Sequence, residues 1–383
     1  MILSSAYYRE GQYLFGRIEE RIKEAERRLS RKVIRLSLGD VTCPVAPCVA
    51  YAMEVASREM VRGETFRGYP PSTGFPFVKE AIAKTYRGLV NPDEIFVSDG
   101  AKSDLAGWAY LFDKSLPALI PDPSYPVYRD SSRLVGREIV ALPCTQDNDF
   151  VPTIPSFEGR SLIYLCSPAN PTARTMTMKE LQEWVDYAIK TNSIILFDAA
   201  YQAFALEGPR SIYEIEGAKE CAIEIGSLSK SASFGGLRFG WSIVPAQLQV
   251  DGIKLANVWR RRQSTLFNGV SYVTQRGAEA ALSKEGLQYS AQCVEKYRQN
   301  THYMASQLAL YTSVQYGDAP YVWVKVSTNG VDVFERLLEM GVSVTPGEGF
   351  GKEGYQYIRL SGFAKREDIE HSLTILSTLT QNL

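Results

Sequence analysis

Histidine is the scarcest residue type in this chain of 383 residues, which contains only His302 and His371. A Ser-His-Asp triad needs a well-placed histidine, and so do most catalytic zinc sites. Neither histidine lies in a motif, so we expect both to be surface or packing residues. Any catalysis should then depend on lysine, carboxylates, tyrosines or a cofactor, and we predict no metal site.

The chain also lacks an excess of charge of either sign, because its 42 basic side chains are balanced by 43 acidic ones. A net charge of −1 gives no overall field that would attract nucleic acid or an anionic membrane, and neither partner is expected. The strongest basic run, Arg260 to Arg262, is typical of a solvated helix face.

Long apolar runs are absent too, since no stretch approaches the roughly 18 residues that a membrane-spanning helix needs. The segment from Met1 to Tyr13 shows no signal-peptide pattern. The six cysteines are scattered without a CxxC pair, which is typical of reduced thiols in a cytosolic protein. We therefore expect the protein to be cytoplasmic.

Apolar runs alternate with helical patterns along most of the chain. Buried strands are predicted at 95–97, 162–166, 194–197 and 221–225, and they are apolar throughout. Strands of this kind separated by helices predict an α/β fold whose mostly parallel sheet is covered on both faces. Thr177 and Glu180 form a capping box that predicts the start of one of these helices.

A second, smaller α+β region is predicted from the two ends of the chain. The N-terminal helix has apolar residues at 18, 22, 25 and 29, and a longer helix over about 284–310 places Leu287, Ala291 and Val294 on one face. We predict a large domain over 39–283 and a small domain from 1–38 and 284–383, which includes an N-terminal arm.

One motif is rejected on its context. Gly349 to Gly354 matches the GxGxxG pattern, but dinucleotide binding needs a strand before it and a helix after it. Here a strand-like segment follows, at 357–360, so a glycine-rich turn is expected instead.

Polar residues follow the ends of four predicted strands. Asp198 and Tyr201 follow one strand, Lys230 and Asn170 each follow another, and Asp99-Gly100-Ala101-Lys102 follows the fourth and begins a helix. Each alone is typical of a cap, a turn or a surface position. Ligands of open α/β sheets bind outside the carboxyl ends of the strands, so their joint occurrence predicts one site.

The joint chemistry is that of pyridoxal phosphate. This cofactor needs an amine that bonds to its aldehyde, for which Lys230 is the candidate, and a carboxylate beside the pyridine nitrogen, for which Asp198 is the candidate. Asn170 and Tyr201 can hydrogen-bond the ring oxygen, and Tyr125 can stack on the ring. The phosphate can be held by a helix N-terminus and nearby donors, at Ala101, Lys102, Ser227, Ser229 and Arg238.

Longer stretches carry a resemblance to the fold-type-I pyridoxal-phosphate aminotransferases, and within them to the LL-diaminopimelate aminotransferases. They cover the chain from about residue 13 to 375 and include Leu38-Gly39-Asp40-Val41-Thr42, Phe66-Arg67-Gly68-Tyr69, Phe96-Val97-Ser98-Asp99-Gly100-Ala101-Lys102, Asp122-Pro123-Ser124-Tyr125-Pro126-Val127-Tyr128, Phe197-Asp198-Ala199-Ala200-Tyr201, Ser227-Leu228-Ser229-Lys230, Phe267-Asn268-Gly269-Val270-Ser271-Tyr272, Ala319-Pro320-Tyr321-Val322-Trp323-Val324-Lys325 and Ile358-Arg359-Leu360-Ser361.

The resemblance implies further roles. Arg359 would bind the substrate α-carboxylate in a bidentate fork. Tyr69, toward the phosphate, and Asn268 would reach across the interface of a homodimer with shared active sites. The remaining substrate-binding positions that it implies are Tyr13, Gly39, Lys102 and Asn170, with Lys102 near a distal carboxylate.

Two segments depart from the family pattern. Pro70-Pro71-Ser72-Thr73-Gly74 stands where the family has Gly-Pro-Glu-Gln-Gly, so the glutamate expected to meet the distal ammonium of diaminopimelate is missing. Ala169-Asn170-Pro171-Thr172-Ala173 stands where the family has Asn-Asn-Pro-Thr-Gly, although Asn170 is kept. The first departure can relax or change the specificity.

The predicted function is transamination between LL-diaminopimelate and 2-oxoglutarate, in lysine and peptidoglycan precursor synthesis, with Lys230, Asp198 and Tyr201 as the catalytic residues. One alternative keeps the cofactor but changes the substrate or reaction, as in another aminotransferase, a lyase or an oxidase of specialised metabolism. A second alternative is a non-enzymatic binding protein on the same fold.

Overall fold

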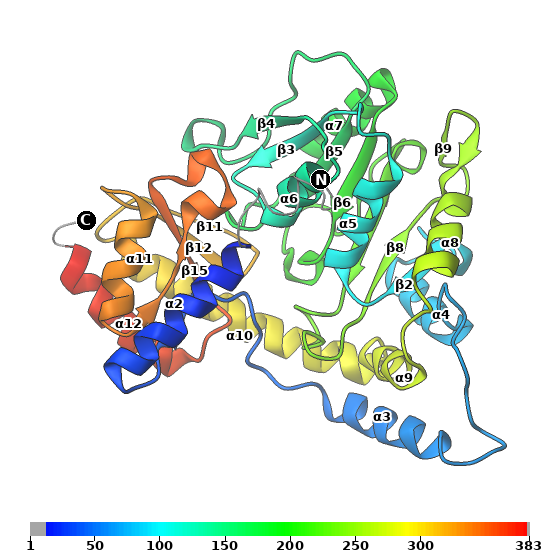
Figure 1. Cartoon of the computed structure of the whole chain (residues 1–383), viewed down its shortest axis with the longest axis horizontal. Helices are drawn as coiled ribbons and strands as arrows, with labels where there is room; N and C mark the ends of the chain where they lie inside the picture. The colour runs from blue at the N-terminus through cyan, green and yellow to red at the C-terminus, as the bar shows by residue number, and fades with distance from the viewer. Residues whose placement is uncertain (1–12, 381–383) are drawn as a thin grey trace, which may run out of the picture.

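The computed structural model describes residues 13–380, and its largest unit is a seven-stranded sheet (Figure 1). The spatial order is β2 (Ile95–Ser98), β8 (Gly240–Ile243), β7 (Ala222–Ser227), β6 (Ile194–Asp198), β5 (Leu162–Cys166), β3 (Ala118–Asp122) and β4 (Ile139–Pro143). Only β8 runs antiparallel to its two neighbours. The prediction of a mostly parallel sheet is confirmed, although the sequence analysis did not find β8.

Helices cover both faces of this sheet. The layer against one face is formed by α5 (Ala101–Leu111), α6 (Pro126–Leu134) and α8 (Leu255–Leu266). The layer against the other is formed by α4 (Pro76–Thr85), α7 (Met178–Thr191) and α9 (Tyr272–Ala281). The Thr177 hydroxyl accepts from the Glu180 amide, so the capping box predicted at the start of α7 is confirmed. Strands buried on both faces explain the continuous apolar runs.

The second unit is a four-stranded antiparallel sheet with helices (Figure 1). Its strands in spatial order are β11 (Val314–Tyr316), β12 (Tyr321–Lys325), β15 (Tyr357–Ser361) and β14 (Thr345–Pro346). The helices are α2 (Leu14–Leu29), α10 (Lys284–Leu308), α11 (Gly330–Glu339) and α12 (Arg366–Thr380). One apolar core joins α2 to α11, α12 and this sheet. The domain boundaries remain a prediction, and residues 1–12 of the predicted arm lie outside the described residues.

Within residues 13–380, four two-residue strands and one further α-helix, α3, lie outside the two sheets. A parallel pair joins β1 (Ile34–Arg35) to β13 (Val342–Ser343), a hairpin joins β9 (Gln249–Val250) to β10 (Ile253–Lys254), and α3 (Pro47–Glu59) packs on α9. The expected N-terminal helix face is confirmed, because Ile18, Ile22 and Ala25 of α2 are buried.

The predicted face of α10 was only partly right, because Val294 is buried as expected but the other two residues are not. Leu287 is 45% exposed and Ala291 is also exposed. The buried face also carries Tyr297, whose hydroxyl accepts from the amides of Thr42 and Cys43, and Asn300, which donates to two carbonyls. Because polar side chains with hydrogen-bond partners are buried there, the apolar pattern alone could not define the whole buried face.

Other expectations about the surface hold. Both histidines are exposed, with the His302 ring 5.3 Å from that of Tyr316. Arg260 and Arg261 are exposed, and the Arg262 guanidinium lies 4.7 Å from the Trp259 ring centre. The six cysteines are free.

Residues 13–380 contain neither a candidate membrane span nor a candidate metal-binding cluster. No helix in this range is long and apolar enough to cross a membrane. No group of three or more His, Cys, Asp or Glu side chains in this range could hold a metal ion.

Candidate active site

A cavity of about 470 Å³ lies where the carboxyl ends of β5, β6 and β7 meet the N-terminus of α5 and strand β15. It brings together most of the predicted site residues, namely Tyr13, Gly39, Ala101, Lys102, Tyr125, Asn170, Asp198, Tyr201, Ser227, Ser229, Lys230, Arg238 and Arg359. Two predicted residues do not line it: Tyr69, which is 90% exposed, and Asn268, which is exposed as well. Their predicted roles in a partner's site remain predictions.

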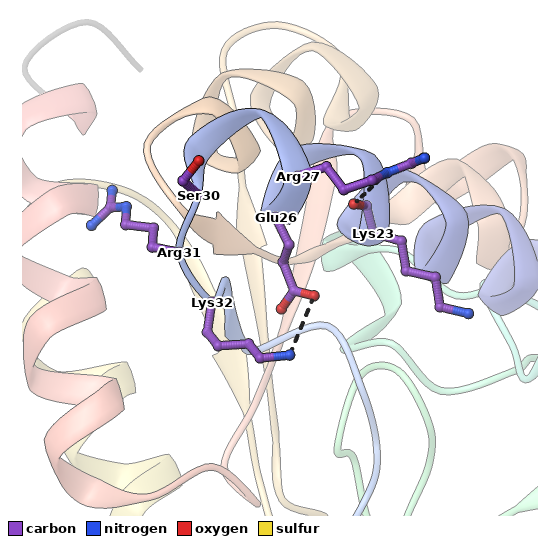
Figure 2. A pocket seen from close by; sticks show the side chains of 6 residues that line it. All are labelled: Lys23, Glu26, Arg27, Ser30, Arg31 and Lys32. Carbon is purple, nitrogen blue, oxygen red and sulfur yellow. Dashed lines mark hydrogen bonds and ion pairs between the residues drawn. The ribbon is translucent and has the colours of Figure 1, made fainter.

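A larger hollow lies elsewhere, at the end of α2 (Figure 2). It is open to solvent and lined almost entirely by charged side chains, of which Lys32 and Glu26 form an ion pair of 3.8 Å. Ligand sites are usually concave, with apolar walls and a few convergent polar groups. The cavity at the strand ends has those properties, so it is the candidate active site.

Lys230 follows β7 and points into the cavity, where its Nζ donates a hydrogen bond to the carbonyl of Gly39. Desolvation, together with the nearby cations Arg359, Arg238 and Lys102, lowers the pKa of this amine to about 8, although the charge of Asp40 acts to raise it. A lysine with this pKa is partly neutral near pH 7, so its nitrogen can act as a nucleophile or a base.

Asp198 is the last residue of β6, and its carboxylate is buried beside the cavity. Its Oδ2 accepts from the Tyr128 hydroxyl at 2.6 Å, and its Oδ1 accepts from the Ala200 amide at 3.0 Å. Burial raises the pKa of Asp198, while these two hydrogen bonds and the charge of Lys230 lower it. The carboxylate is therefore fixed in place and prepared to face a cation in the cavity.

Arg359 lies on β15 and is only 1% exposed. Its Nη1 donates to Asn170 Oδ1 at 2.7 Å, and its Nη2 donates to the Ser37 carbonyl at 2.8 Å. Its Nε has no partner among the described residues. The described hydrogen bonds of this buried guanidinium go to neutral oxygens, so they do not neutralise its charge. Arg359 is therefore suited to bind the carboxylate of a ligand.

Tyrosine rings form one wall of the cavity. The hydroxyls of Tyr201 and Tyr321 lie 2.6 Å apart, and the Arg359 guanidinium carbon lies 4.2 Å from the centre of the Tyr321 ring. Across the cavity, the Lys102 ammonium lies 4.4 Å from the centre of the Tyr13 ring. Burial raises the pKa of Tyr125, so this hydroxyl stays protonated.

The N-terminus of α5 supplies a site for an anion. Its cap, Gly100, provides no capping side chain, and Ala101 and Lys102 line the cavity. Arg238 lies beside Gly100, since a Cβ built on Gly100 would be 2.5 Å from Arg238 Nη2. Free backbone amides at a helix start together with a guanidinium form the kind of site that binds phosphate.

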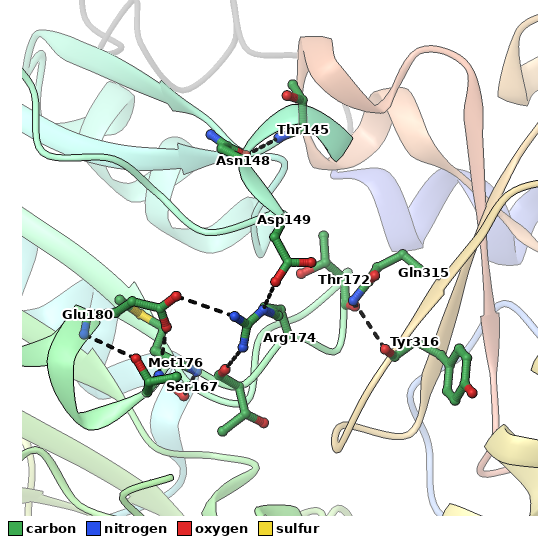
Figure 3. A network of polar contacts seen from close by, with 12 residues as sticks. Thr145, Asn148, Asp149, Ser167, Thr172, Arg174, Met176, Glu180, Gln315 and Tyr316 are labelled. Carbon is green, nitrogen blue, oxygen red and sulfur yellow. Dashed lines mark hydrogen bonds and ion pairs between the residues drawn. The ribbon is translucent and has the colours of Figure 1, made fainter. Parts of the chain in front are cut away.

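The altered loop around Asn170 is held on both sides (Figure 3). Arg174 bonds to Asp149 at 2.9 Å and to Glu180 at 3.3 Å, and Gln315 donates to the Thr172 carbonyl at 3.3 Å. Ala173, at the position of the family's glycine, adopts a φ of 61°, in the left-handed region. Residue 173 thus has a backbone conformation that favours glycine, although it is an alanine.

Three polar residues at or next to the cavity were not predicted from the sequence as site residues. Tyr128 holds Asp198, Tyr321 holds Tyr201, and Asp40 lines the cavity. All three lie inside stretches that carried the resemblance, and that position is the signal that could have found them. Strand ends alone did not indicate them, because Tyr128 lies within α6 and Tyr321 begins β12.

Comparisons with known proteins agree with this geometry. The family model described as aminotransferase class I and II matches residues 31–376. The chain belongs to the class I and II aminotransferases. It therefore moves an amino group between an amino acid and an oxo acid, and enzymes of this family generally depend on pyridoxal phosphate.

Several proteins that are similar to this aminotransferase are LL-diaminopimelate aminotransferases. LL-diaminopimelate aminotransferase of Azobacteroides pseudotrichonymphae is 43% identical and that of Bacteroides fragilis 42%, over 96% and 94% of both chains respectively. The solved structure of L,L-diaminopimelate aminotransferase from Chlamydomonas reinhardtii superposes with a TM-score of 0.93, covering 99% of both chains at 34% identity. The predicted fold class and family are confirmed.

Proposed function

We propose that this aminotransferase binds pyridoxal phosphate in the cavity at the strand ends and uses LL-diaminopimelate as amino donor and 2-oxoglutarate as acceptor. The observation that carries the proposal is the convergence of Lys230, Asp198 and Arg359 on one cavity, each fixed by hydrogen bonds. The product of this donor cyclises to tetrahydrodipicolinate, which places the reaction in lysine and peptidoglycan precursor synthesis.

The residues present fit the cofactor. Lys230 is a desolvated amine, and Asp198 is a buried carboxylate that would face the pyridinium nitrogen. Tyr125 would stack on the ring, and Asn170 and Tyr201 would bond its oxygen. The phosphate would be held by the start of α5 together with the remaining donors, Ser227, Ser229 and Arg238, and by Tyr69 of a second subunit.

When bound, pyridoxal phosphate withdraws electrons from the carbon next to the reacting nitrogen, so that a proton can leave that carbon. Once it is free of the cofactor, Lys230 Nζ would accept this proton and deliver it on the other side of the reacting nitrogen, the 1,3-shift that transamination requires, because its lowered pKa makes both protonation states accessible near neutral pH. Asp198 maintains the charge that makes the withdrawal effective, and Arg359 orients the substrate through its α-carboxylate. Tyr201 and Tyr321 close one wall and exclude water.

The charges in the cavity match the proposed donor. After one amine of diaminopimelate has reacted, two carboxylates and one ammonium remain. Arg359 and Lys102 are available for the carboxylates. Asp40 and Asp198 are the carboxylates that line this cavity among the described residues, and Asp198 is assigned to the cofactor. Asp40 is therefore proposed as the partner of the distal ammonium, in place of the glutamate missing from 70–74.

A panel of amino donors with 2-oxoglutarate tests the proposal. The purified enzyme, loaded with pyridoxal phosphate, should form glutamate faster from LL-diaminopimelate than from aspartate, alanine or tyrosine. If the enzyme forms no glutamate from diaminopimelate but is active on another donor, the proposed substrate is wrong and the proposed reaction, transamination, still holds. The Pro70–Gly74 segment favours that alternative, in which the enzyme is an aminotransferase for another amino acid.

We also propose that the enzyme is a homodimer with shared active sites and that it acts in the cytoplasm. Exposed Tyr69 and Asn268 support the first point, because neither reaches the cavity of its own chain. A mixture of Lys230→Ala and Tyr69→Phe chains tests it: hybrid dimers would contain one complete site, so about a quarter of the wild-type activity should appear. No recovery beyond the sum of the separate variants would contradict a shared site.

A further inference from the structure

The glycine-rich segment at 349–354 binds a buried carboxylate from the large sheet. Asp122, the last residue of β3, is 4% exposed. Its Oδ2 accepts from the Lys352 amide at 3.1 Å and its Oδ1 from the Glu353 amide at 3.2 Å. Arg129 approaches the same carboxylate, with Nη2 3.3 Å from Oδ2. The large sheet is thereby joined to the glycine-rich segment through a charged group and two backbone amides.

Glycine is required at the centre of this junction. Gly351 has a φ of 147°, and a Cβ built on it would lie 1.8 Å from Asp122 Oδ1. Any side chain at this position would displace the carboxylate. A further backbone bond, from the Ser124 amide to the Phe350 carbonyl at 2.9 Å, closes the junction on the other side.

Both ends of the junction lead into the active site. Asp122 is followed three residues later by Tyr125, which lines the cavity. The glycine-rich segment carries Phe350, which is fully buried and whose ring centre lies 4.8 Å from the Arg359 guanidinium carbon. The hydrogen bonds from the Lys352 and Glu353 amides to Asp122 therefore connect two parts of the site. One is the loop of Tyr125, which would lie under the cofactor ring, and the other is Phe350, which packs on Arg359.

We propose that Asp122 is a positioning residue, which holds the Gly349–Gly354 segment against the Tyr125 loop and so sets Phe350 and Arg359 for carboxylate binding. This inference rests on the proposed function, because it takes Arg359 as the group that binds the carboxylate of both substrates. Asp122 itself does not line the cavity. Its effect on the reaction passes through the backbone of the glycine-rich segment.

The test uses the cofactor-loaded enzyme with two variants that break the junction from opposite sides. Asp122→Asn replaces one carboxylate oxygen by an amide NH₂, which cannot accept from the backbone. Gly351→Ala places a methyl group at the carboxylate. Asp113→Asn, at an exposed acidic residue, is the matched control for the first. Gly88→Ala is the matched control for the second, because Gly88 has a φ of 89° with open space around its Cβ.

We expect each junction variant to raise the KM for both the amino donor and the oxo acid about tenfold, since a charged hydrogen bond is lost, while kcat changes less than about threefold. The double variant should resemble the single ones, because both break the same junction. Amide hydrogen exchange at Lys352 and Glu353 should be faster in both single variants than in the wild type. This measurement needs no substrate, so it does not depend on which donor the enzyme uses. The two controls should match the wild type.

Unchanged KM values for Asp122→Asn, or additive effects in the double variant, would overturn the proposal. Slow exchange at the two amides in Asp122→Asn would also overturn it. If Gly351→Ala fails to fold, Asp122→Asn against Asp113→Asn decides. A wild-type enzyme inactive on diaminopimelate would count against the proposed function alone, since the exchange measurement and the KM of another donor still test Asp122.

Discussion

The hydroxyl of Tyr128 donates a hydrogen bond of 2.6 Å to Oδ2 of Asp198, and both side chains are buried. Tyr128→Phe removes this donor from an ionised carboxylate, so the pKa of Asp198 should rise further. We expect the cofactor affinity and kcat to fall about tenfold, as is typical for a lost hydrogen bond to a charged group. Tyr164→Phe is the matched control, because the Tyr164 ring stacks on Tyr128 but its hydroxyl makes no bond to Asp198. Equal activity of Tyr128→Phe and wild type would contradict the role given to this pair.

Lys230 is expected to be indispensable. Lys230→Ala should lose the visible absorbance of bound cofactor and lower turnover by at least about 10³-fold, because no other described amine occupies its place. Lys230→Arg keeps a positive charge but supplies no comparable nucleophile, and it should be equally inactive. Absorbance spectra and single-turnover assays measure both effects, and undiminished turnover in either variant would disprove the mechanism.

The pKa of Lys230 predicts how cofactor uptake depends on pH. Burial lowers this pKa to about 8, and only the neutral amine attacks the aldehyde, so the rate should rise with pH through about pH 8 and level off above about pH 9. Between pH 7 and pH 9 the neutral fraction rises from about a tenth to about nine tenths. Stopped-flow mixing of apo-protein with pyridoxal phosphate measures this rate. A rate that keeps rising to pH 10 would indicate an ordinary lysine instead.

Asp40 should determine the preference among donors. Asp40→Asn removes the negative charge proposed to face a distal ammonium, so KM for LL-diaminopimelate should rise about tenfold. A donor with a distal carboxylate but no distal ammonium, such as aspartate, should be affected less than about twofold. An equal rise in KM for both donors would show instead that Asp40 acts on Lys230 or on the stability of the fold.

The two histidines should be dispensable. His302 and His371 are both exposed, and neither lines the cavity. Replacing both by glutamine should leave kcat and KM within about twofold of the wild type, since Lys230 moves the proton that a histidine moves in many other enzymes. Steady-state kinetics of the double variant measure this, and a tenfold loss would require a histidine in the mechanism.

Local sequence was sufficient for the strands and their polar ends. The strand at Leu162–Cys166 was predicted with its final bounds, and the strand ending at Asp198 was predicted within one residue, because both are apolar runs followed by a turn. The prediction that Asp198, Lys230 and Asn170 share one site follows from a general rule about parallel sheets. The structure places all three on one cavity.

Contacts between distant residues could not be predicted in this way. Tyr128 and Asp198 are 70 positions apart, and Asn170 and Arg359 are 189 apart. No periodicity in either segment indicates the other, and the polar buried face of α10 was missed for the same reason. Hydrogen-bond pairing depends on the packing of whole elements, which a window of sequence does not contain.

The amino-acid sequence by itself therefore determined the architecture and the set of reactive groups, because hydrophobic periodicity and polar strand ends are local properties. Only the tertiary structure decided which side chains hold those groups. Tyr128 on Asp198, Asn170 on Arg359 and Asp122 on the glycine-rich segment all arise where elements remote in the chain meet in three dimensions. At such meeting points a buried polar group must find its partner, whatever its distance along the chain.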